Sequence, residues 1–243
     1  MQTANAYDRQ LETLRVYGGL VEEREDWGGG LVLCCGEGCA ASGTPVAVSI
    51  AGGATLALDG DAGVVKAAMR RGELDFVVNT LDEALRALKN EVRLRRPLSV
   101  GLIADVSATL REMVERGVLP DLLLIGANQN AQAVLQDESI RALQAIGMPL
   151  RLATDRPEVE LSSSPRMTLS SKPLDEFYLP ATNAAELRAL DERVLAILPA
   201  GDLVRRRWIR RIAKYLREAR SGGRWVWLTE EELKRLREAG IQD

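Results

Sequence analysis

The sequence predicts an α/β fold built on a doubly wound, mostly parallel sheet with a helical C-terminal extension. Between residues 28 and 154, short apolar runs of strand length alternate six times with stretches of helical spacing. This alternation is typical of a parallel sheet with helices on both faces. The first run, 31–35 (LVLCC), has no charged or strongly polar residue, as expected of a strand buried on both faces.

The expected elements follow one another at short intervals. Strands are expected at 31–35, 54–58, 74–78, 98–103, 121–125 and 149–153. Helices are expected at 45–52, 62–71, 80–93, 105–116 and 130–146. Thr80 and Glu83 form a capping-box pattern that starts one of these helices, and Gly117 is placed to end another.

The rest of the chain follows other patterns. We expect an N-terminal helix within 1–27, the sheet domain over 28–154, a Ser- and Pro-rich loop or arm over 155–180, and a helical C-terminal segment over 181–243. The C-terminal helices are equally compatible with a cover for the sheet, a dimerisation arm and a small cap.

The composition excludes several kinds of chemistry. The 243 residues include no histidine, which removes Ser-His and Cys-His nucleophile pairs and imidazole metal ligands. The net charge of −3 provides no general attraction for polyanions, so nucleic acid is not an expected partner. No apolar run approaches the ~18 residues that a membrane-spanning helix needs. We therefore expect a cytoplasmic protein that has no membrane partner.

The three cysteines lie within six positions of one another, at 34, 35 and 39. An odd, clustered set does not indicate a disulfide framework, and without a fourth ligand it makes a poor zinc site. We expect Cys34 and Cys35 to be small core residues of the first strand. Cys39 is expected at a helix N-terminus, where the helix dipole favours the thiolate.

A candidate ligand site begins where the first expected strand ends. Residues 36–41 (GEGCAA) fit the pattern G-x-G-x-x-A. In that pattern Gly36 permits a tight turn, Gly38 lets a pyrophosphate approach the backbone, and Ala41 lets helix and strand pack closely. The next strand ends at Asp59, whose carboxylate is placed to accept both ribose hydroxyls of a dinucleotide. The alternative is a glycine-rich turn without a ligand, in which Asp59 only caps the strand end.

The segment 126–130 (GANQN) follows the fifth expected strand at the same carboxyl edge, where open α/β sheets bind their ligands. Its amides are suited to a polar ligand, and Asn130 is equally suited to cap the next helix. The candidate cofactor-binding residues are Gly36, Gly38, Cys39, Ala41, Ser42, Asp59, Gly126 and Asn128. No catalytic residue and no metal site is assigned.

About residues 28–125 resemble the NAD-binding domain of urocanase (urocanate hydratase). The resemblance is carried by SIAGGATLALD at 49–59, by LDFVVNTLDEALRALKNEVRLRRPLSVGL at 74–102, and by LREMVERGVLPDLL at 110–123. It implies a Rossmann-like fold and NAD as the cofactor. The loop departs from the family pattern, because Cys39, Ala41 and Ser42 stand where the family has glycines.

In urocanases the NAD-binding domain is inserted in a core domain that supplies much of the substrate pocket and the catalytic cysteine. No segment similar to that core is recognisable before Trp27 or after Leu152. We therefore expect a urocanase-like dinucleotide-binding protein of unassigned role, and not an autonomous urocanate hydratase. The alternatives are a scaffold that has lost its ligand and acts by protein contact, and a subunit of a split hydratase or lyase.

The expected helix at 201–220 is the one feature that favours nucleic acid. It carries the run Arg205, Arg206, Arg207, Arg210 and Arg211 beside Trp208. Its apolar residues also fall on one stripe, so we interpret it as an amphipathic helix with a solvated basic face. Such a helix would pack on its own protein or on a second copy, and acidic stretches elsewhere are consistent with a homodimer.

Overall fold

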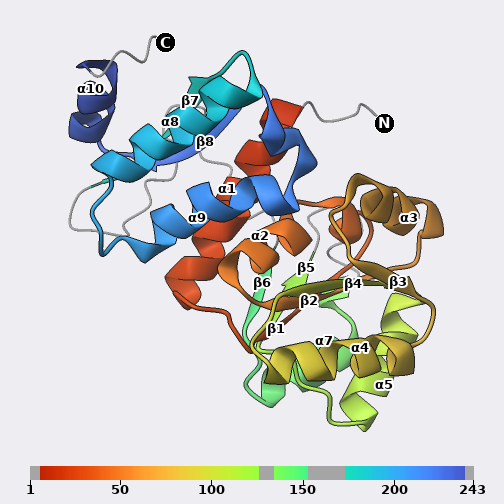
Figure 1. Cartoon of the computed structure of the whole chain (residues 1–243). Helices are drawn as coiled ribbons and strands as arrows, with labels where there is room; N and C mark the ends of the chain where they lie inside the picture. Colours follow the sequence, from red (N-terminus) through yellow and green to blue (C-terminus); the bar gives the residue numbers. More distant parts are fainter. Residues whose placement is uncertain (1–5, 126–133, 153–172, 239–243) are drawn as a thin grey trace. The chain divides into compact units, whose positions relative to one another are not determined.

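The computed structural model describes residues 6–125, 134–152 and 173–238, and the chain divides into two compact units (Figure 1). Asp26–Asp155 form one of them, called here the sheet unit. Met1–Glu25 and Arg156–Asp243 together form the other, called here the terminal unit. The sheet unit is therefore inserted, along the sequence, between the two parts of the terminal unit.

The sheet unit is built on six parallel strands, which confirms the predicted sheet. The strands are β1 (Leu31–Cys35), β2 (Ala54–Asp59), β3 (Phe76–Val78), β4 (Leu98–Ile103), β5 (Leu122–Ile125) and β6 (Leu150–Leu152). Their order across the sheet is β3-β4-β2-β1-β5-β6. Because β1 and β2 pair on one side and β1 and β5 on the other, the winding direction reverses at β1, and ligands of open α/β sheets bind at such a point.

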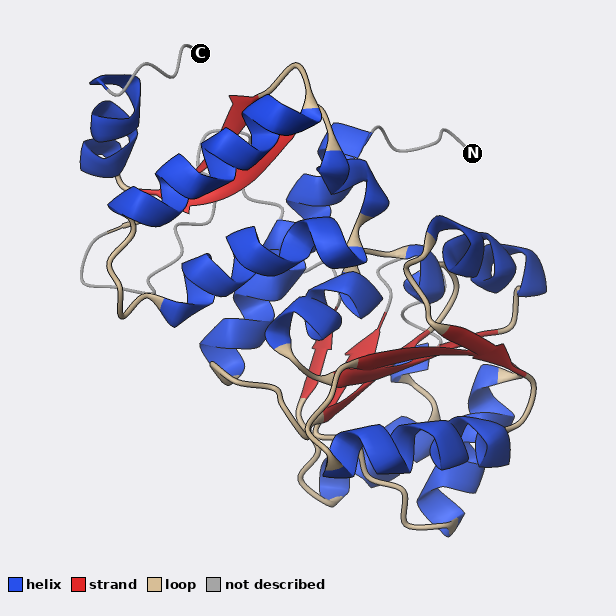
Figure 2. Ribbon diagram, in the orientation of Figure 1, coloured by secondary structure: helices blue, strands red, loops and turns tan. Residues whose placement is uncertain are grey.

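Helices cover both faces of this sheet (Figure 2), which makes it doubly wound. The helices are α2 (Thr44–Ala51), α3 (Ala62–Arg71), α4 (Leu81–Arg93), α5 (Val106–Glu115) and α7 (Glu138–Ala145). Side chains of α4, α5 and α7 share one apolar cluster with β1, β2, β4 and β5. A smaller cluster on the opposite face joins α3 to β2.

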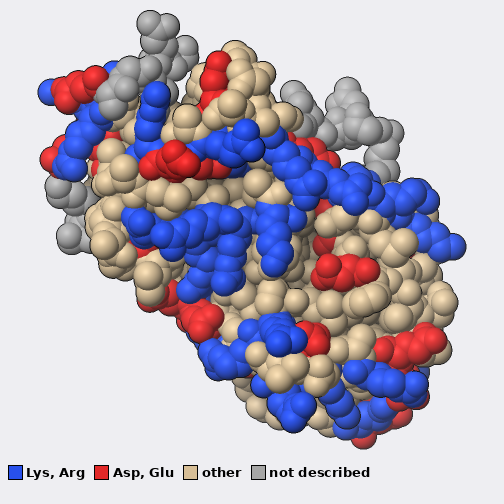
Figure 3. All heavy atoms as spheres, viewed as in Figure 1, with Lys and Arg blue, Asp and Glu red and all other residues tan. Residues whose placement is uncertain are grey.

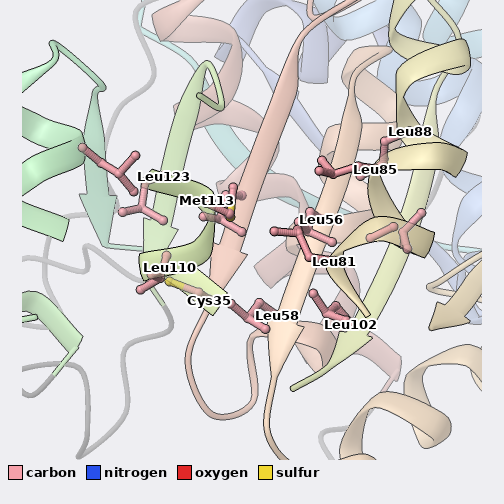
Figure 4. Close-up of a cluster of buried hydrophobic side chains, with 14 of the residues drawn as sticks. Cys35, Leu56, Leu58, Leu81, Leu85, Leu88, Leu102, Leu110, Met113 and Leu123 are labelled. Carbon is pink, nitrogen blue, oxygen red and sulfur yellow. The ribbon is translucent and has the colours of Figure 1, made fainter. Parts of the chain in front are cut away.

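Strand alternation assigns each core side chain to one face of the sheet. Leu33 stands opposite Leu56 and Leu123 in the register of the central strands, and all three belong to the larger cluster. Cys35 points into that cluster beside Leu110 (Figure 4), whereas its neighbour Cys34 faces the other side. The larger cluster is the main apolar core of the sheet unit.

The helix boundaries follow the local signals in the sequence. Thr80 and Glu83 form the predicted capping box at the start of α4. The side chain of Asp105 caps α5, and Gly117 follows that helix with a φ of 63°. The helix expected at 130–146 is different, because Asp137 caps a separate helix, α7, that begins at Glu138.

The terminal unit combines helices with a small antiparallel sheet. Its elements are α1 (Ala6–Glu23), β7 (Asp175–Pro180), α8 (Ala184–Ile197), α9 (Leu203–Tyr215), the 3₁₀ helix η2 (Arg217–Arg220), β8 (Gly223–Leu228) and α10 (Glu230–Glu238). β7 and β8 pair over their full lengths. The C-terminal region is helical, as expected, and it also contains these two strands, which the sequence analysis did not identify.

The N-terminal helix α1 belongs to this unit because its polar side chains bind the C-terminal backbone. The side-chain amide of Gln10 pairs with β8, accepting from the amide of Trp225 and donating to the carbonyl of Gly223 (3.4 Å). The hydroxyl of Tyr17 donates to the carbonyl of Val204 (2.8 Å). None of the helices that the structure describes combines the length and apolarity needed to cross a membrane.

Candidate functional site

The glycine loop after β1 has the backbone geometry that the sequence predicts. Gly36 and Gly38 have φ values of 105° and 81°, a backbone conformation that residues other than glycine rarely adopt. A Cβ placed on Gly38 would meet no atom within 4 Å. The side of the second glycine on which a Cβ would stand therefore faces open space.

The loop leads into a short 3₁₀ helix, η1 (Cys39–Ala41), and the α-helix α2 begins only at Thr44. Ala41 therefore lies in the 3₁₀ turn and not in the first turn of α2. The hydroxyl of Ser42 makes hydrogen bonds within the loop, because its Oγ donates to the carbonyl of Cys39 (2.7 Å) and accepts from the amide of Thr44 (3.2 Å). These bonds fix the path between the glycine turn and α2.

Asp59 lies beside this loop, at the carboxyl end of β2. Its Oδ2 accepts from the amide of Gly38 (2.9 Å), and its Oδ1 accepts from the amide of Asp61 (2.9 Å). The residue is only 1% exposed. Burial raises the pKa of Asp59, and the two amide hydrogen bonds oppose part of that effect. The structure thus brings together two predicted site residues, with the carboxylate bound to the loop backbone.

The N-terminus of α2 adds a residue that the sequence analysis missed. Thr44 is fully buried, and its Oγ1 has no hydrogen-bond partner among the described residues. Pro45 has no N–H, and the amide of Val46 is one of those that a helix leaves without an internal acceptor. Together with the helix dipole, these groups suit an anion. The only signal in the sequence is a hydroxyl residue directly before a proline at a helix start.

Cys34 and Cys39 form a disulfide across the glycine turn, with their Cα atoms 6.0 Å apart. The expectation that the cysteines form no disulfide is therefore wrong. It failed because spacing along the sequence does not show that the turn brings Cys39 back to the face of Cys34. Cys35 is a buried free thiol on the opposite face, and burial raises its pKa to about 12 (Figure 4).

The remaining predicted site residues, Gly126 and Asn128, lie outside the described residues. The strand that precedes them, β5, ends at Ile125, which is paired with Cys35 at the end of β1. The chain therefore enters this segment at the edge that carries the glycine loop. Among the residues that the structure describes, no group of three or more Cys, Asp or Glu is arranged to hold a metal ion.

Lys and Arg side chains gather over α9 (Figure 3), but three of the five arginines in the run bind other groups of the terminal unit. Arg205 forms buried ion pairs with Asp202 (2.6 Å) and Glu232 (2.6 Å). Arg206 donates to two carbonyls at the end of α8, and Arg207 donates to the carbonyl of Glu25 (2.6 Å). The interpretation of this run as a solvated face is wrong for Arg205, which is buried, whereas Arg206 and Arg207 are half-buried and bind backbone carbonyls of the same unit.

The comparison with protein families agrees with the geometry of the sheet unit. Residues 11–130 match the family model described as the urocanase Rossmann-like domain. The match contains β1 to β5, the glycine loop and Asp59, and it begins within α1. This segment of the chain therefore resembles the urocanase Rossmann-like domain, and the parallel sheet agrees with that resemblance.

Proposed function

We propose that the sheet unit binds NAD, or a closely related dinucleotide, at the carboxyl edge of β1 and β2. The observation that carries this proposal is the meeting of Asp59 with the amide of Gly38 at 2.9 Å. The acid of the second strand and the glycine loop of the first are then next to each other, as a bound dinucleotide requires. The family match supports the same class of ligand.

The residues present fit such a ligand in three respects. Open space in front of Gly38 admits a pyrophosphate to the backbone. The unpaired hydroxyl of Thr44 and the first amides of α2 offer hydrogen-bond donors to its oxygens. The Asp59 carboxylate can accept about four hydrogen bonds, of which two are used, so it retains acceptor capacity for ribose hydroxyls that reach it when the loop moves away from the buried carboxylate. Gly126 and Asn128, which follow β5, complete the proposed set.

The proposed role is cofactor binding and not autonomous catalysis. The chain contains no histidine, and we identify no residue that would transfer a proton to or from a substrate. A bound NAD⁺ would supply an electrophilic or hydride-accepting ring, and the sheet unit would hold and orient it. A hydratase or lyase activity would then depend on a partner that supplies the substrate pocket.

Calorimetric titration with NAD⁺, together with mass spectrometry of small molecules released from the purified chain, tests the proposal. Thr44→Val and Thr55→Val form a matched pair, because both hydroxyls are buried and unpaired but only Thr44 lies at the start of α2. Loss of a hydrogen bond to a charged group costs about 1.5–3 kcal/mol, so Thr44→Val should weaken binding at least about tenfold. Thr55→Val should leave the affinity unchanged.

Two further variants test the loop and the acid. Gly38→Val would place a side chain in the open space and is expected to abolish binding. Asp59→Ala removes the proposed ribose acceptor and should also weaken binding strongly. Absence of heat at millimolar NAD⁺ and of any released nucleotide would contradict the proposal, and would favour the scaffold that acts by protein contact.

A further inference from the structure

The disulfide between Cys34 and Cys39 encloses the glycine turn of the candidate site. Cys34 lies in β1, Cys39 begins η1, and the bridge spans Gly36, Glu37 and Gly38. The Cα separation of 6.0 Å is one that a disulfide bridges without backbone movement. The conformation of residues 36–38 in the structure is therefore that of the oxidised, disulfide-bonded protein.

We propose that Cys34 and Cys39 are a reversible redox pair, whose disulfide keeps the glycine loop closed and whose reduction opens it to the nucleotide. The reversibility of the pair is inferred from the positions of the two cysteines alone. The effect on nucleotide binding rests on the proposed function of the sheet unit.

In the bridged state the two groups that a dinucleotide needs are bonded to each other. The amide of Gly38 donates to Asp59, and the carboxylate of Asp59 is almost completely buried. Full access to the ribose therefore requires the turn to move away from the end of β2. The bridge opposes this movement, because it ties Cys39 to β1, a central strand of the sheet.

Without the bridge the turn is held by weaker bonds. The amide of Ala41 donates to the carbonyl of Gly38 (3.0 Å), and the amide and hydroxyl of Ser42 donate to the carbonyl of Cys39 (3.2 Å and 2.7 Å). Single hydrogen bonds of this kind contribute about 0.5–1.5 kcal/mol each, so local opening becomes accessible once the covalent bond is broken. Reduction thus converts a fixed turn into one that the ligand can displace.

The chemistry is thiol–disulfide exchange with a small-molecule disulfide such as glutathione disulfide. In the forming direction the thiolate of Cys39 attacks the disulfide and releases one glutathione thiolate, leaving a mixed disulfide on Cys39. The thiolate of Cys34 then attacks the sulfur of Cys39 and releases the second glutathione thiolate. The two cysteines lose two protons to solvent and two electrons to the oxidant, and excess glutathione reverses the steps. Both sulfurs are buried, so exchange proceeds through transient opening of the turn.

Cys35 provides an internal reference for this pair. It is adjacent in the sequence, but it points to the opposite face of the sheet, into the main core, and it remains a free thiol. A buried thiol with a raised pKa is a poor nucleophile. Cys35 should therefore stay reduced under conditions that oxidise the other two.

Alkylation of the full chain after denaturation tests reversibility directly. Trypsin cleavage after Arg24 and Lys66 releases one peptide that contains all three cysteines. After incubation with glutathione disulfide this peptide should carry one alkyl group, on Cys35, and after excess glutathione it should carry three. Three alkyl groups under both conditions would overturn the proposal.

The effect on binding is tested by titrating NAD⁺ into the oxidised and the reduced protein. Reduced protein should bind at least about tenfold more tightly than oxidised protein. Cys34→Ala, which removes the bridge without changing a candidate binding residue, should bind like the reduced protein under both conditions. Cys35→Ala is the matched control and should retain the difference between the two states.

Hydrogen exchange of the loop amides distinguishes failure of the control by the disulfide from failure of the proposed nucleotide binding. Residues 36–42 should exchange more slowly in the oxidised protein, whether or not a nucleotide binds. Equal exchange and equal affinity in the two states would overturn the control of the loop by the disulfide. A redox difference in exchange without NAD⁺ binding in either state would leave the reversible pair standing, and would refute the proposed function and the nucleotide effect together.

Discussion

In the terminal unit the buried guanidinium groups of Arg205 and Arg224 are held by carboxylates, whereas the buried Asp59 beside the glycine loop of the sheet unit is held only by backbone amides among the described residues. In the terminal unit Arg205 is paired with Asp202 and Glu232, and Arg224 is paired with Asp191 (2.6 Å). In the sheet unit the described partners of Asp59 are backbone amides. A buried polar group without a full set of partners costs about 1–3 kcal/mol of stability.

The two units also differ in how they reach their stability. The sheet unit relies on close apolar packing, and even a glycine in a central strand is surrounded by side chains. The terminal unit has a two-stranded sheet, which is marginal by itself, and it adds side-chain hydrogen bonds from α1 and buried ion pairs. We infer that substitutions of polar residues affect the terminal unit most, and that changes of volume affect the sheet unit most.

The largest effect is expected for Glu232→Gln in the terminal unit. Glu232 accepts two hydrogen bonds from the buried guanidinium of Arg205 and one from the amide of Thr229. Removal of one partner from a buried ion pair costs about 3 kcal/mol or more. The matched control is Glu231→Gln, whose ion pair with Arg235 is exposed and should contribute little. Urea unfolding followed by tryptophan fluorescence measures both, because three of the four tryptophans lie in this unit.

A volume change is expected to have the next largest effect, in the sheet unit. A Cβ added at Gly101 in β4 would lie 2.7 Å from side-chain atoms of both Leu74 and Val65. Such overpacking costs about 1–3 kcal/mol. Gly60→Ala is the control, since its Cβ would meet no atom closer than 3.8 Å. Pulse labelling of the Cys35 thiol in increasing urea reports unfolding of this unit. Equal midpoints for the two variants would contradict the packing argument.

A smaller effect is expected for Gln10→Ala, which removes the side chain that joins α1 to β8. The amide of Trp225 would lose its acceptor, and an unsatisfied backbone group of this kind costs about 1–2 kcal/mol. Glu12→Ala, on the same helix, makes no such bond and serves as the control. If both variants unfold at the wild-type urea concentration, α1 does not stabilise the terminal unit through Gln10.

The parts of the fold that the sequence predicted are those that depend on neighbouring residues. The capping box of Thr80 and Glu83 and the cap at Asp105 involve residues three positions apart. The parallel strands were predicted because each is a short apolar run between helical patterns. The left-handed conformation of Gly38 follows from the glycine pattern itself. Local physics was sufficient for all of these features.

The parts that the sequence did not predict depend on residues that meet only in the folded chain. β7 and β8 pair across more than forty intervening residues, and RWVWL at 224–228 was included in a helical region. The bridge between Cys34 and Cys39 depends on the path of a turn, and not on the spacing of the cysteines. In the same way, the sequence placed Asp59 at a strand end but did not indicate that its carboxylate binds the loop amide.

The smallest predicted effect is a difference between the two units in how their stability changes as the pH is lowered. Burial opposes ionisation of Glu232, but its hydrogen bonds from Arg205 and Thr229 outweigh burial and lower its pKa. Its contribution to stability is therefore present above the unfolded pKa of about 4.3 and is lost as the pH falls through the lower, folded value. The pKa of Asp59 is raised by burial, so its unfavourable ionisation in the folded state is relieved as the pH falls toward its unfolded value of about 3.9.

Acidification from neutral pH should consequently remove the stabilising contribution of Glu232 to the terminal unit, whereas the contribution of Asp59 to the sheet unit should change in the opposite direction. Tryptophan fluorescence reports the urea midpoint of the terminal unit, and labelling of Cys35 with a pyridyl disulfide, which reacts with thiols in acid, reports that of the sheet unit. Glu232→Gln should flatten the pH dependence of the terminal unit, and Asp59→Asn should remove the stabilisation of the sheet unit in mild acid. If both units lose stability in parallel in the wild-type protein and in both variants, the contrast between paired and unpaired buried carboxylates does not control their response to pH.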